Sequence, residues 1–399
     1  MIRTGFFLNL NYGWVGGINY YRNLLTAIFE NENNIIEPVI FFPGNKNVSN
    51  LLEGFPPFEI VRDRCFDRYS LSWFLQRVGE KDLKNNIVLE KQIKTLLYEN
   101  NIEVISHSVD LFNLNLSSPM LGWIPDFQHL RMPEFFSGEE LEQRKQRFTS
   151  LCDESARIIL SSFSARKDLA LFAPEHVDKS RVLQFPVKPV SQNDILGLAE
   201  LQKKYNFSGS YFHLPNQFWK HKNHRIVIEA LKILKSKNHQ VRIIATGNTV
   251  DYRHPGFFDN LLYDITRDGL LDSFIILGLV PYTDMVSLMF NSVAVINPSF
   301  FEGWSTTVEE ARSIGKKLIL SDIDVHREQA PRGAHYFDPQ NAEELAAVLW
   351  EVWSSFDNEH DRLMRIKAQE DFPIRWKNFA ESYSGIVLES LEVKRHQPK

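Results

Sequence analysis

Two glutamates, Glu302 and Glu310, stand on either side of a predicted helix start, with seven residues between them. A buried strand ends just before Glu302, and the helix is expected to stop at Gly315. The backbone N–H groups of residues 303–306 then lie at a helix N-terminus, an arrangement that binds anions such as phosphate. Because carboxylates repel phosphate, the glutamates are better suited to accept hydrogen bonds from sugar and ribose hydroxyl groups. The spacing alone fits equally well a strand, a loop and a helix with two solvated glutamates.

Other acidic residues near this helix are predicted to have structural roles. Thr306 and Glu309 have the spacing of a capping box, in which the glutamate serves the helix start. Asp322 and Asp324 form a D-x-D string, a pattern that can hold a divalent metal on a diphosphate. They follow a strand beyond the helix and have no supporting carboxylate cluster, so we interpret them as a strand-end turn. We therefore expect no metal site and no cofactor.

Short apolar runs alternate with longer amphipathic stretches, and this alternation occurs twice along the chain. Strand–helix alternation predicts a parallel sheet covered by helices, so the two series predict an α/β protein with two doubly wound, Rossmann-like domains. Such sheets bind ligands at the carboxyl ends of their strands, and two of them facing each other form a cleft. The predicted strands cover residues 6–8, 38–42, 103–106, 120–124 and 158–161, then 211–214, 241–245, 274–277, 293–296 and 317–320.

A stretch with prolines and polar residues separates the two series. It places the N-terminal domain at residues 1–190, a linker at 191–208 and the C-terminal domain at 209–371. The last stretch, 372–399, contains an amphipathic helix that fits either domain, including a return to the N-terminal one.

Residues 298–311, which contain Glu302 and Glu310, resemble the E-x7-E region of the retaining family 4 glycosyltransferases, the glycosyl transferases group 1. The resemblance continues through residues 313–322, covers most of the C-terminal half and extends more loosely to the N-terminal half. It implies the GT-B fold, with a nucleotide-sugar donor held by the C-terminal domain. It also implies that Glu310 holds the donor ribose and that Glu302 contacts the sugar ring. The loop whose amides would meet the donor phosphates and sugar consists of Gly303, Trp304, Ser305 and Thr306.

The first strand of the second series ends in a stretch that is similar to the family's phosphate-binding segment. Lys222 matches the lysine that helps neutralise the diphosphate there. The arginine that accompanies it in the family is replaced by Asn216 or Gln217, and Lys220 or Arg225 is a candidate substitute. Guanidinium forks across two oxygens whereas an ammonium is a point charge, so the replacement changes how a diphosphate would be held. Without the resemblance, Lys222 is better interpreted as an exposed lysine at a helix start.

Three glycine-containing segments are also similar to family loops. Gly16 and Gly17 follow the first strand, where the family has a glycine-rich loop that approaches donor phosphate and acceptor; an ordinary tight turn is the alternative. Gly247 ends one strand of the C-terminal domain. Gly278 and Val280 end another, where the family's backbone meets the nucleotide base.

On the acceptor side, one strand is followed by Pro125 and Asp126, where many family members have histidine and aspartate. That histidine usually faces the donor sugar. Its replacement leaves Asp126 or His129 to line the acceptor side, and with Glu302 these residues form the predicted catalytic set. His107, at another strand end, is a further candidate, although a histidine at such a position is more often a packed polar residue.

Composition narrows the partners. The chain of 399 residues has a net charge of -5, whereas a protein that grips nucleic acid usually carries a basic surplus. Its two cysteines make neither a disulfide framework nor a zinc site, and no run is apolar enough for a membrane span. We therefore predict a cytoplasmic protein without a nucleic-acid partner. Residues 62–77 hold four arginines among aromatic residues, and peripheral contact with a membrane or lipid-linked acceptor is an alternative there to a solvated helical face.

These observations predict a hexosyltransferase-like enzyme of polysaccharide biosynthesis. It would move a sugar from a nucleotide-sugar donor to a saccharide or lipid-linked saccharide, with retention of the anomeric configuration and without a bound metal. Two alternatives stay open: a sugar-nucleotide epimerase or hydrolase of the same fold, and a non-catalytic relative that binds a nucleotide sugar.

Overall fold

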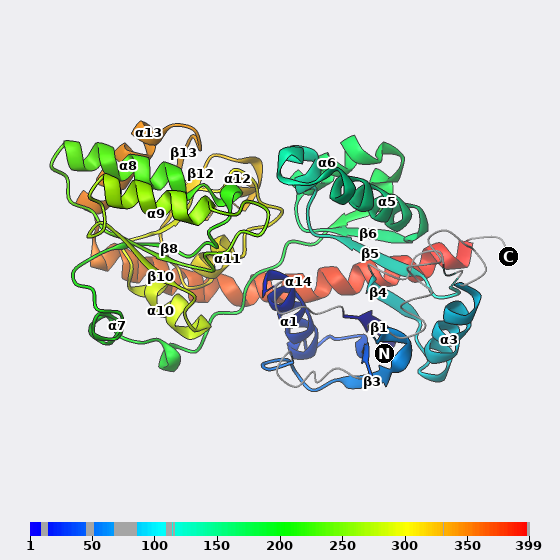
Figure 1. The fold of residues 1–399 in the computed structure, drawn as a ribbon. Coiled ribbons are helices and arrows are strands. Elements are labelled where there is room, and N and C mark those ends of the chain that lie inside the picture. Colours follow the sequence, from blue (N-terminus) through cyan, green and yellow to red (C-terminus); the bar gives the residue numbers. More distant parts are fainter. Residues whose placement is uncertain are drawn as a thin grey trace. The chain divides into compact units, whose positions relative to one another are not determined.

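A computed structural model describes residues 1–8, 15–44, 52–67, 86–108, 114, 116–329 and 331–396. The chain divides into two compact units, each with its own parallel sheet (Figure 1). Unit 1 consists of Met1–Phe185 and Arg375–Lys399, and unit 2 of Pro186–Ile374. The segment expected to be a linker, residues 191–208, lies in unit 2 and contains helix α7 (Leu198–Tyr205), whose Leu201 is buried.

The described residues of unit 1 form a parallel sheet in the order β3-β2-β1-β4-β5-β6-β7. The order reverses direction at β1, as in a doubly wound fold. The strands are β1 (Ile2–Phe7), β2 (Ile36–Pro43), β3 (Glu59–Asp63), β4 (Val104–Ser108), β5 (Met120–Ile124), β6 (Arg157–Leu160) and β7 (Ser180–Val182).

Helices cover both faces of this sheet, because alternate residues of each strand point to opposite sides. Met120 and Ile124 of β5 pack on the side of α3, α5 and α6, whereas Trp123 stacks on Tyr20 of α1 at 4.3 Å between ring centroids. The helices of unit 1 are α1 (Val15–Glu30), α3 (Asn86–Glu99), α4 (Gln128–Arg131), α5 (Gly138–Glu154), α6 (Phe163–Phe172) and the second part of α14 (Asn358–His396).

A chain of buried polar side chains links the helices α14 and α1 through the end of β4. The Tyr383 hydroxyl donates to Ser106 Oγ at 2.8 Å, and the His107 ring lies 2.8 Å from Ser106 Oγ and 2.7 Å from Tyr20 Oη. His107 is fully buried, and this burial lowers its pKa to about 3. His107 is therefore a neutral, packed core residue, as its strand-end position suggested.

The expected glycine-rich loop after β1 differs in the structure. Helix α1 begins at Val15, so Gly16 and Gly17 lie in its first turn instead of in a loop. Residues 9–14, which precede them, lie outside the described part of the chain. The prediction of a loop at Gly16 and Gly17 is therefore wrong. Both glycines are helical residues, and Gly16 is exposed.

Unit 2 contains a six-stranded parallel sheet in the order β10-β9-β8-β11-β12-β13. Its strands are β8 (Phe212–Leu214), β9 (Ile243–Thr246), β10 (Phe274–Gly278), β11 (Val295–Asn297), β12 (Leu318–Ser321) and β13 (Ala334–Phe337). Its helices are α7, α8 (His224–Ser236), α9 (Phe257–Arg267), α10 (Tyr282–Asn291), α11 (Thr306–Ser313), α12 (Asp324–Gln329), α13 (Ala342–Ser354) and the first part of α14.

Amphipathic helices bury the two faces of this second sheet. Apolar residues of α8 recur with helical spacing, at Val227, Ala230, Leu231 and Leu234, and pack in one core with α9 and α13. On the other face, α10 and α11 pack in a second core with alternate residues of β11 and β12. Both faces are covered, so the loops at the strand ends are left to form a site.

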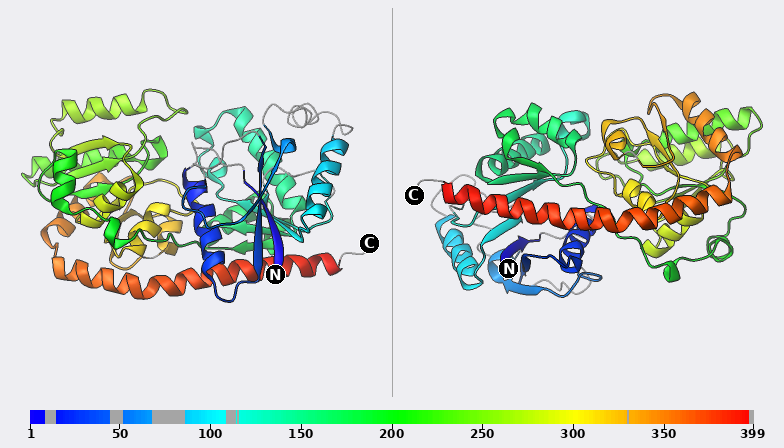
Figure 2. Two further views of the ribbon diagram at one scale, coloured as in Figure 1. Left: turned by 90° about the horizontal axis from the view of Figure 1, so that it is seen from below. Right: turned by 180° about the vertical axis from the view of Figure 1, so that it is seen from behind.

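The C-terminal helix is longer than expected, since α14 begins at Asn358 and not near residue 372. Its residues up to Ile374 belong to unit 2, and those from Arg375 onward belong to unit 1. Figure 2 shows this second part lying along the sheet of unit 1. There Trp376 Nε1 donates to Glu30 Oε2 at 3.0 Å, and Glu389 pairs with Arg157 and Arg181.

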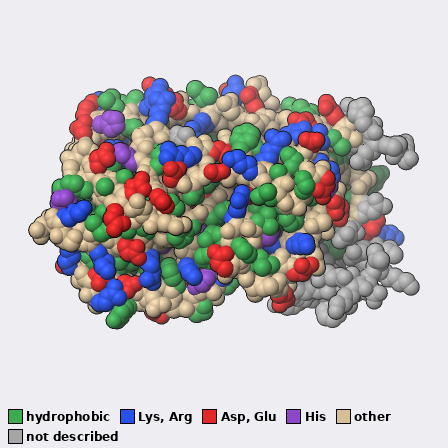
Figure 3. Space-filling view, turned by 90° about the horizontal axis from the view of Figure 1, so that it is seen from above, with side chains coloured by type: hydrophobic (Ala, Val, Ile, Leu, Met, Phe, Trp, Pro, Cys, Tyr) green, Lys and Arg blue, Asp and Glu red, His purple; other side chains and the backbone are tan. Residues whose placement is uncertain are grey.

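Charges of both signs are interspersed over the face of the molecule seen in Figure 3. Among the described helices, none is both long and apolar enough to cross a bilayer. Most of the arginine-containing segment considered for membrane contact, residues 68–77, lies outside the described residues.

Candidate donor-binding site

The site in unit 2 is built on two neighbouring strands, β8 and β11, which pair in parallel. Parallel strands place their carboxyl ends at one edge of the sheet, so the loops that follow them meet there. The loop after β8 ends in the short helix η6 (Lys220–Lys222), and the loop after β11 leads through Glu302 into α11. The amide of Phe300 joins the two loops by donating to the carbonyl of His221 at 2.9 Å.

Lys222 and Glu302 form an ion pair at this edge. Lys222 Nζ lies 2.7 Å from Glu302 Oε1 and 2.9 Å from Oε2. Only 17% of the lysine side chain and 10% of the glutamate side chain are exposed. The lysine is therefore a partly buried, paired residue, and the exposed lysine that sequence alone favoured is not what the structure has.

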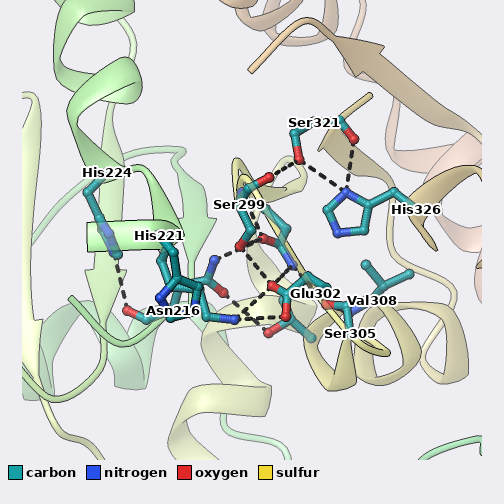
Figure 4. A network of polar contacts seen from close by, with 12 residues as sticks. Asn216, His221, His224, Ser299, Glu302, Ser305, Val308, Ser321 and His326 are labelled. Carbon is teal, nitrogen blue, oxygen red and sulfur yellow. Dashed lines mark hydrogen bonds and ion pairs between the residues drawn. The ribbon is translucent and has the colours of Figure 1, made fainter. Parts of the chain in front are cut away.

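A network of polar side chains holds Glu302 in place (Figure 4). Ser299 Oγ donates to Glu302 Oε1 at 2.7 Å, and Asn297 Nδ2 approaches it at 3.4 Å. Asn216 Nδ2 donates to Asn297 Oδ1 at 3.0 Å. Asn216 occupies one of the two positions considered for the family's arginine. It is only 3% exposed, and the hydrogen bond from its side-chain amide shows that it supports this network.

Electrostatics keep the Glu302 carboxyl ionised. Burial by itself raises the pKa of Glu302, but the Lys222 ammonium and the hydrogen bonds from Lys222 and Ser299 outweigh it and hold the pKa at about 2. The carboxylate is thus an acceptor at every physiological pH.

Helix α11 begins beside this pair, and its cap differs from the expected one. Ser305 is the N-cap residue, and its side chain accepts from the amide of Val308. Glu309 is buried and accepts from Gln329 Nε2 at 3.0 Å, so the predicted capping box of Thr306 and Glu309 is wrong. Ser305 can replace Thr306 as the cap because its hydroxyl stands one residue earlier and reaches the third amide of the helix.

The remaining loop residues line the same helix start. Trp304 and Ser305 are buried, whereas Gly303 and Thr306 are partly exposed. The first amides of a helix have no intrahelical acceptor, so those at Thr306 and Thr307 are positioned to bind an anion.

Glu310 lies in the same helix, α11, and is a buried acid whose environment differs from that of Glu302. It is 8% exposed, and its partner is the hydroxyl of Tyr282 on α10. Burial raises the pKa of Glu310 to about 7, and the hydrogen bond from Tyr282 only partly opposes this. The two glutamates therefore differ: Glu302 is a paired anion and Glu310 titrates near neutral pH.

Two glycines predicted for the donor site lie at the ends of β9 and β10. A Cβ atom at Gly247, whose φ is 144°, would meet the carbonyl oxygen of Asn216 at 2.4 Å. At Gly278, with φ 68°, no described atom lies within 4 Å of such a Cβ, so this strand end faces open space next to the partly buried Val280. The close approach at Gly247 fixes the β9 loop against the start of the β8 loop.

Replacing Gly247 with alanine is expected to destabilise the protein by about 1–3 kcal/mol, because the methyl group forces the β8 loop away and the backbone is strained. Melting temperatures measure the loss. Gly256 is a matched control: its φ is 82° and no described atom lies near a Cβ there, so G256A has only the left-handed backbone cost of about 1–2 kcal/mol. Equal losses in both variants would show that the contact with Asn216 is unimportant.

The two acceptor-side candidates belong to unit 1 and differ from each other. Asp126 is partly exposed and accepts from the amide of Gln128 at 2.9 Å, next to the start of α4. His129 is 4% exposed and packs against the rings of Phe127, Phe148 and Phe172. Burial, together with a nearby arginine, lowers the pKa of His129. His129 is therefore a neutral core residue, which corrects its assignment to the catalytic set.

The sequence interpretation missed His326, which follows β12 in α12. Its Nδ1 lies 2.9 Å from the carbonyl oxygen of Ser321, and the ring is fully buried. Figure 4 shows the ring beside the Glu302 network, and its proximity helps to lower the pKa of Glu302. The position of His326 just after β12, the strand next to β11, is the sequence signal that could have identified it.

The two candidate substitutes for the family's arginine differ. The Arg225 side chain lies 3.4 Å from the Asp264 carboxylate. Lys220 is exposed, and its backbone amide donates to Asp251. Asp322 of the D-x-D string pairs with Arg327 at 2.6 Å. Among the described residues, no group of three or more acidic, histidine or cysteine side chains could hold a metal ion.

Comparison with known proteins shows the fold class of the chain. The chain has the GT-B fold of two Rossmann-like domains. A glycosyltransferase from Rickettsia africae is 15% identical, with a TM-score of 0.67 over 99% of each chain. Anabaena HepE in complex with UDP and glucose is 15% identical, with a TM-score of 0.69 over 97% of this chain and 100% of its own. The lipopolysaccharide outer core galactosyltransferase WaaB is 14% identical, with a TM-score of 0.64 over 96% and 99%.

The family follows from a separate comparison. Residues 202–370 match the family model of the glycosyl transferases group 1, so the predicted resemblance to group 1 is confirmed for this part of the chain. These residues contain Lys222, Glu302 and Glu310. The sequence matches none of the curated proteins with which it was compared.

Proposed function

We propose that the protein is a retaining, metal-independent glycosyltransferase that moves a sugar from a nucleotide-sugar donor to a saccharide or lipid-linked saccharide. The observation that carries this proposal is the meeting of Lys222, Glu302 and the start of α11 at one edge of the sheet in unit 2. A cation, a carboxylate that accepts hydrogen bonds from hydroxyl groups, and helix-start amides without an intrahelical acceptor are together suited to bind a sugar diphosphate.

Each group has a role in this proposal. Lys222 and the first amides of α11 bind the donor phosphates, and Glu302 accepts hydrogen bonds from sugar hydroxyl groups. Glu310 accepts from the ribose, and the open strand end at Gly278 and Val280 receives the base. HepE, a protein of the same fold, has been solved with UDP and with UDP-glucose, which supports a nucleotide sugar as the ligand.

The chemistry follows from where charge develops. Glycosyl transfer passes through an oxocarbenium-like state, and the departing diphosphate gains negative charge. Lys222 and the amides at Thr306 and Thr307 would stabilise that charge from fixed positions. The departing phosphate would take the acceptor's proton on the same face of the sugar, which yields retention. Asp126 would orient the acceptor hydroxyl.

A thermal-shift screen against UDP-, GDP-, dTDP- and ADP-sugars tests the proposal, because a ligand that binds the folded state raises its apparent stability. We expect one nucleotide class to raise the melting temperature, and donor turnover to require an added saccharide. Donor consumption without an acceptor would favour an epimerase or hydrolase. Binding without any turnover would favour a non-catalytic relative.

Activity is expected to survive excess EDTA, because Lys222 and the α11 amides take the part that a metal has in other glycosyltransferases. The initial rate of donor consumption is measured with and without the chelator. Loss of turnover that Mg²⁺ or Mn²⁺ restores would contradict the metal-independent mechanism.

The product is expected to keep the anomeric configuration of the donor. An inverting enzyme needs a base on the face opposite the leaving group, and Asp126 is the only residue of the predicted catalytic set that could serve as one. NMR of the freshly formed glycoside shows the configuration through the anomeric proton coupling, for a sugar whose coupling separates the anomers. A beta-linked product from an alpha-linked donor would refute both the mechanism and the role of Glu302.

A further inference from the structure

We propose that the Lys222–Glu302 pair is an exchange switch through which the site distinguishes a nucleoside diphosphate sugar from the nucleoside diphosphate alone. The inference rests on the proposed function, because it has the donor phosphates meet Lys222. Phosphates that draw Lys222 toward themselves take hydrogen bonds away from Glu302. Only a ligand that also brings sugar hydroxyl groups replaces those bonds.

The Glu302 carboxylate depends on Lys222 for most of its short hydrogen bonds. Oε1 accepts from Lys222 Nζ and from Ser299 Oγ, both at 2.7 Å, and Oε2 accepts from Lys222 Nζ at 2.9 Å. Asn297 Nδ2 adds a longer contact of 3.4 Å. Removing Lys222 would leave the carboxylate with one short bond at Oε1, although a carboxylate can accept about four hydrogen bonds.

Burial makes this loss matter. With 10% of the Glu302 side chain and 17% of the Lys222 side chain exposed, water can replace the lost bonds only in part. A buried charge that loses its partner is strongly unfavourable, whereas neutral hydroxyl donors can satisfy it.

The switch would also aid turnover. While the sugar is attached, its hydroxyl groups satisfy Glu302 and Lys222 is free to hold the phosphates. After transfer the sugar leaves with the acceptor, and Glu302 regains Lys222 as its partner. The diphosphate then loses part of its binding, which favours release of the product.

A simpler arrangement makes the opposite prediction. An ammonium has three N–H donors, and Glu302 uses two of them. If the third one binds the phosphates while the pair stays intact, Glu302 helps to position Lys222 for every ligand. Removing the Glu302 charge would then weaken the binding of the diphosphate as well.

Titration calorimetry with E302Q separates the two arrangements. The probes are UDP and UDP-glucose, GDP and GDP-mannose, and ADP and ADP-glucose, and the pair that the wild-type protein binds is used. We expect E302Q to bind the nucleoside diphosphate roughly tenfold more tightly and the nucleotide sugar roughly tenfold more weakly. E343Q, at an exposed glutamate in the first turn of α13, is the matched control and should change neither affinity.

A double-mutant cycle shows whether the gain passes through Lys222. K222Q keeps an amide donor for Glu302 but has no charge. The K222Q/E302Q protein has no buried unpaired charge, so its affinity can be measured even if E302Q alone does not fold. In the K222Q background, E302Q is expected to leave the affinity for the diphosphate unchanged.

The outcomes are distinct. Weaker or unchanged binding of the diphosphate by E302Q overturns the switch, and so does an equal gain in the K222Q background, which would indicate direct repulsion between Glu302 and the phosphates. If the wild-type protein binds none of these six nucleotides and no dTDP-sugar in the thermal-shift screen, the proposed function itself is overturned, and the inference with it.

Discussion

The K222M variant is expected to lose about 3 kcal/mol of stability, because it leaves the largely buried Glu302 carboxylate without its cation. Its affinity for the nucleotide sugar should fall roughly tenfold to a hundredfold, as expected for a lost hydrogen bond to a charged group. Urea unfolding measures the first effect and titration calorimetry the second.

Two further variants separate the structural role of Lys222 from its role in binding. In K222M/E302Q the buried unpaired charge is gone, so most of the stability is expected to return while the donor affinity stays low. K220M replaces an exposed lysine of the same short helix, and its stability should stay within about 0.5 kcal/mol of the wild type. Recovery of donor binding in the double variant would show that Lys222 acts only through Glu302.

The E310Q variant is expected to be more stable than the wild type at pH 8, by up to about 3 kcal/mol. The pKa of Glu310 is about 7 in the folded protein against an ordinary 4.5, and each pKa unit of difference corresponds to about 1.4 kcal/mol. Urea unfolding at pH 4.5 and pH 8 measures the difference. E343Q is the control, because that glutamate is exposed.

The sign of this effect follows from which state holds the proton. Below pH 4.5 Glu310 is protonated in both states and has no effect. As the pH rises from 4.5 to 7, the unfolded chain loses this proton and the folded one keeps it, so the folded protein loses stability. Above pH 7 the loss is complete. A stability gain in E310Q that is the same at both pH values would contradict the assignment.

The same variant should bind the nucleotide more weakly. A carboxylate accepts hydrogen bonds from both ribose hydroxyl groups, whereas an amide has one oxygen and presents a donor at the other position. A roughly tenfold loss of nucleotide affinity together with higher stability would identify Glu310 as a residue kept for binding at the expense of the fold. Unchanged affinity would remove Glu310 from the donor site.

Sequence periodicity was a good guide to strands that are buried on both faces. The expected strands at 120–124 and 317–320 correspond to the fully buried β5 and β12 within one residue at each end. Strands β3 and β13 were missed because they lie at sheet edges and are only partly buried, so they have no continuous apolar run. An edge position alone does not hide a strand, because the edge strand β10 has a continuous apolar run and was predicted at 274–277.

The sequence likewise predicted some features of the candidate site and missed others. Spacing placed Glu302 and Glu310 around a helix start because both lie on one continuous strand–loop–helix segment. The pairing of Glu302 with Lys222, 80 positions earlier, depends on where two loops from separate strands turn, and periodicity contains no such information. His129 looked like a site residue because a histidine near a strand end can face a ligand or the core with the same sequence pattern.

The shared helix α14 has a consequence for how the protein is made. Residues 375–396 supply Tyr383 and Val387 to the core of unit 1, yet the ribosome makes them after all of unit 2. N-terminal domains commonly fold first during synthesis. Here residues 186–374 are complete before unit 1 has its closing helix. The core of unit 1 is therefore completed only after all of unit 2 has been synthesised, because Tyr383 and Val387 come from α14.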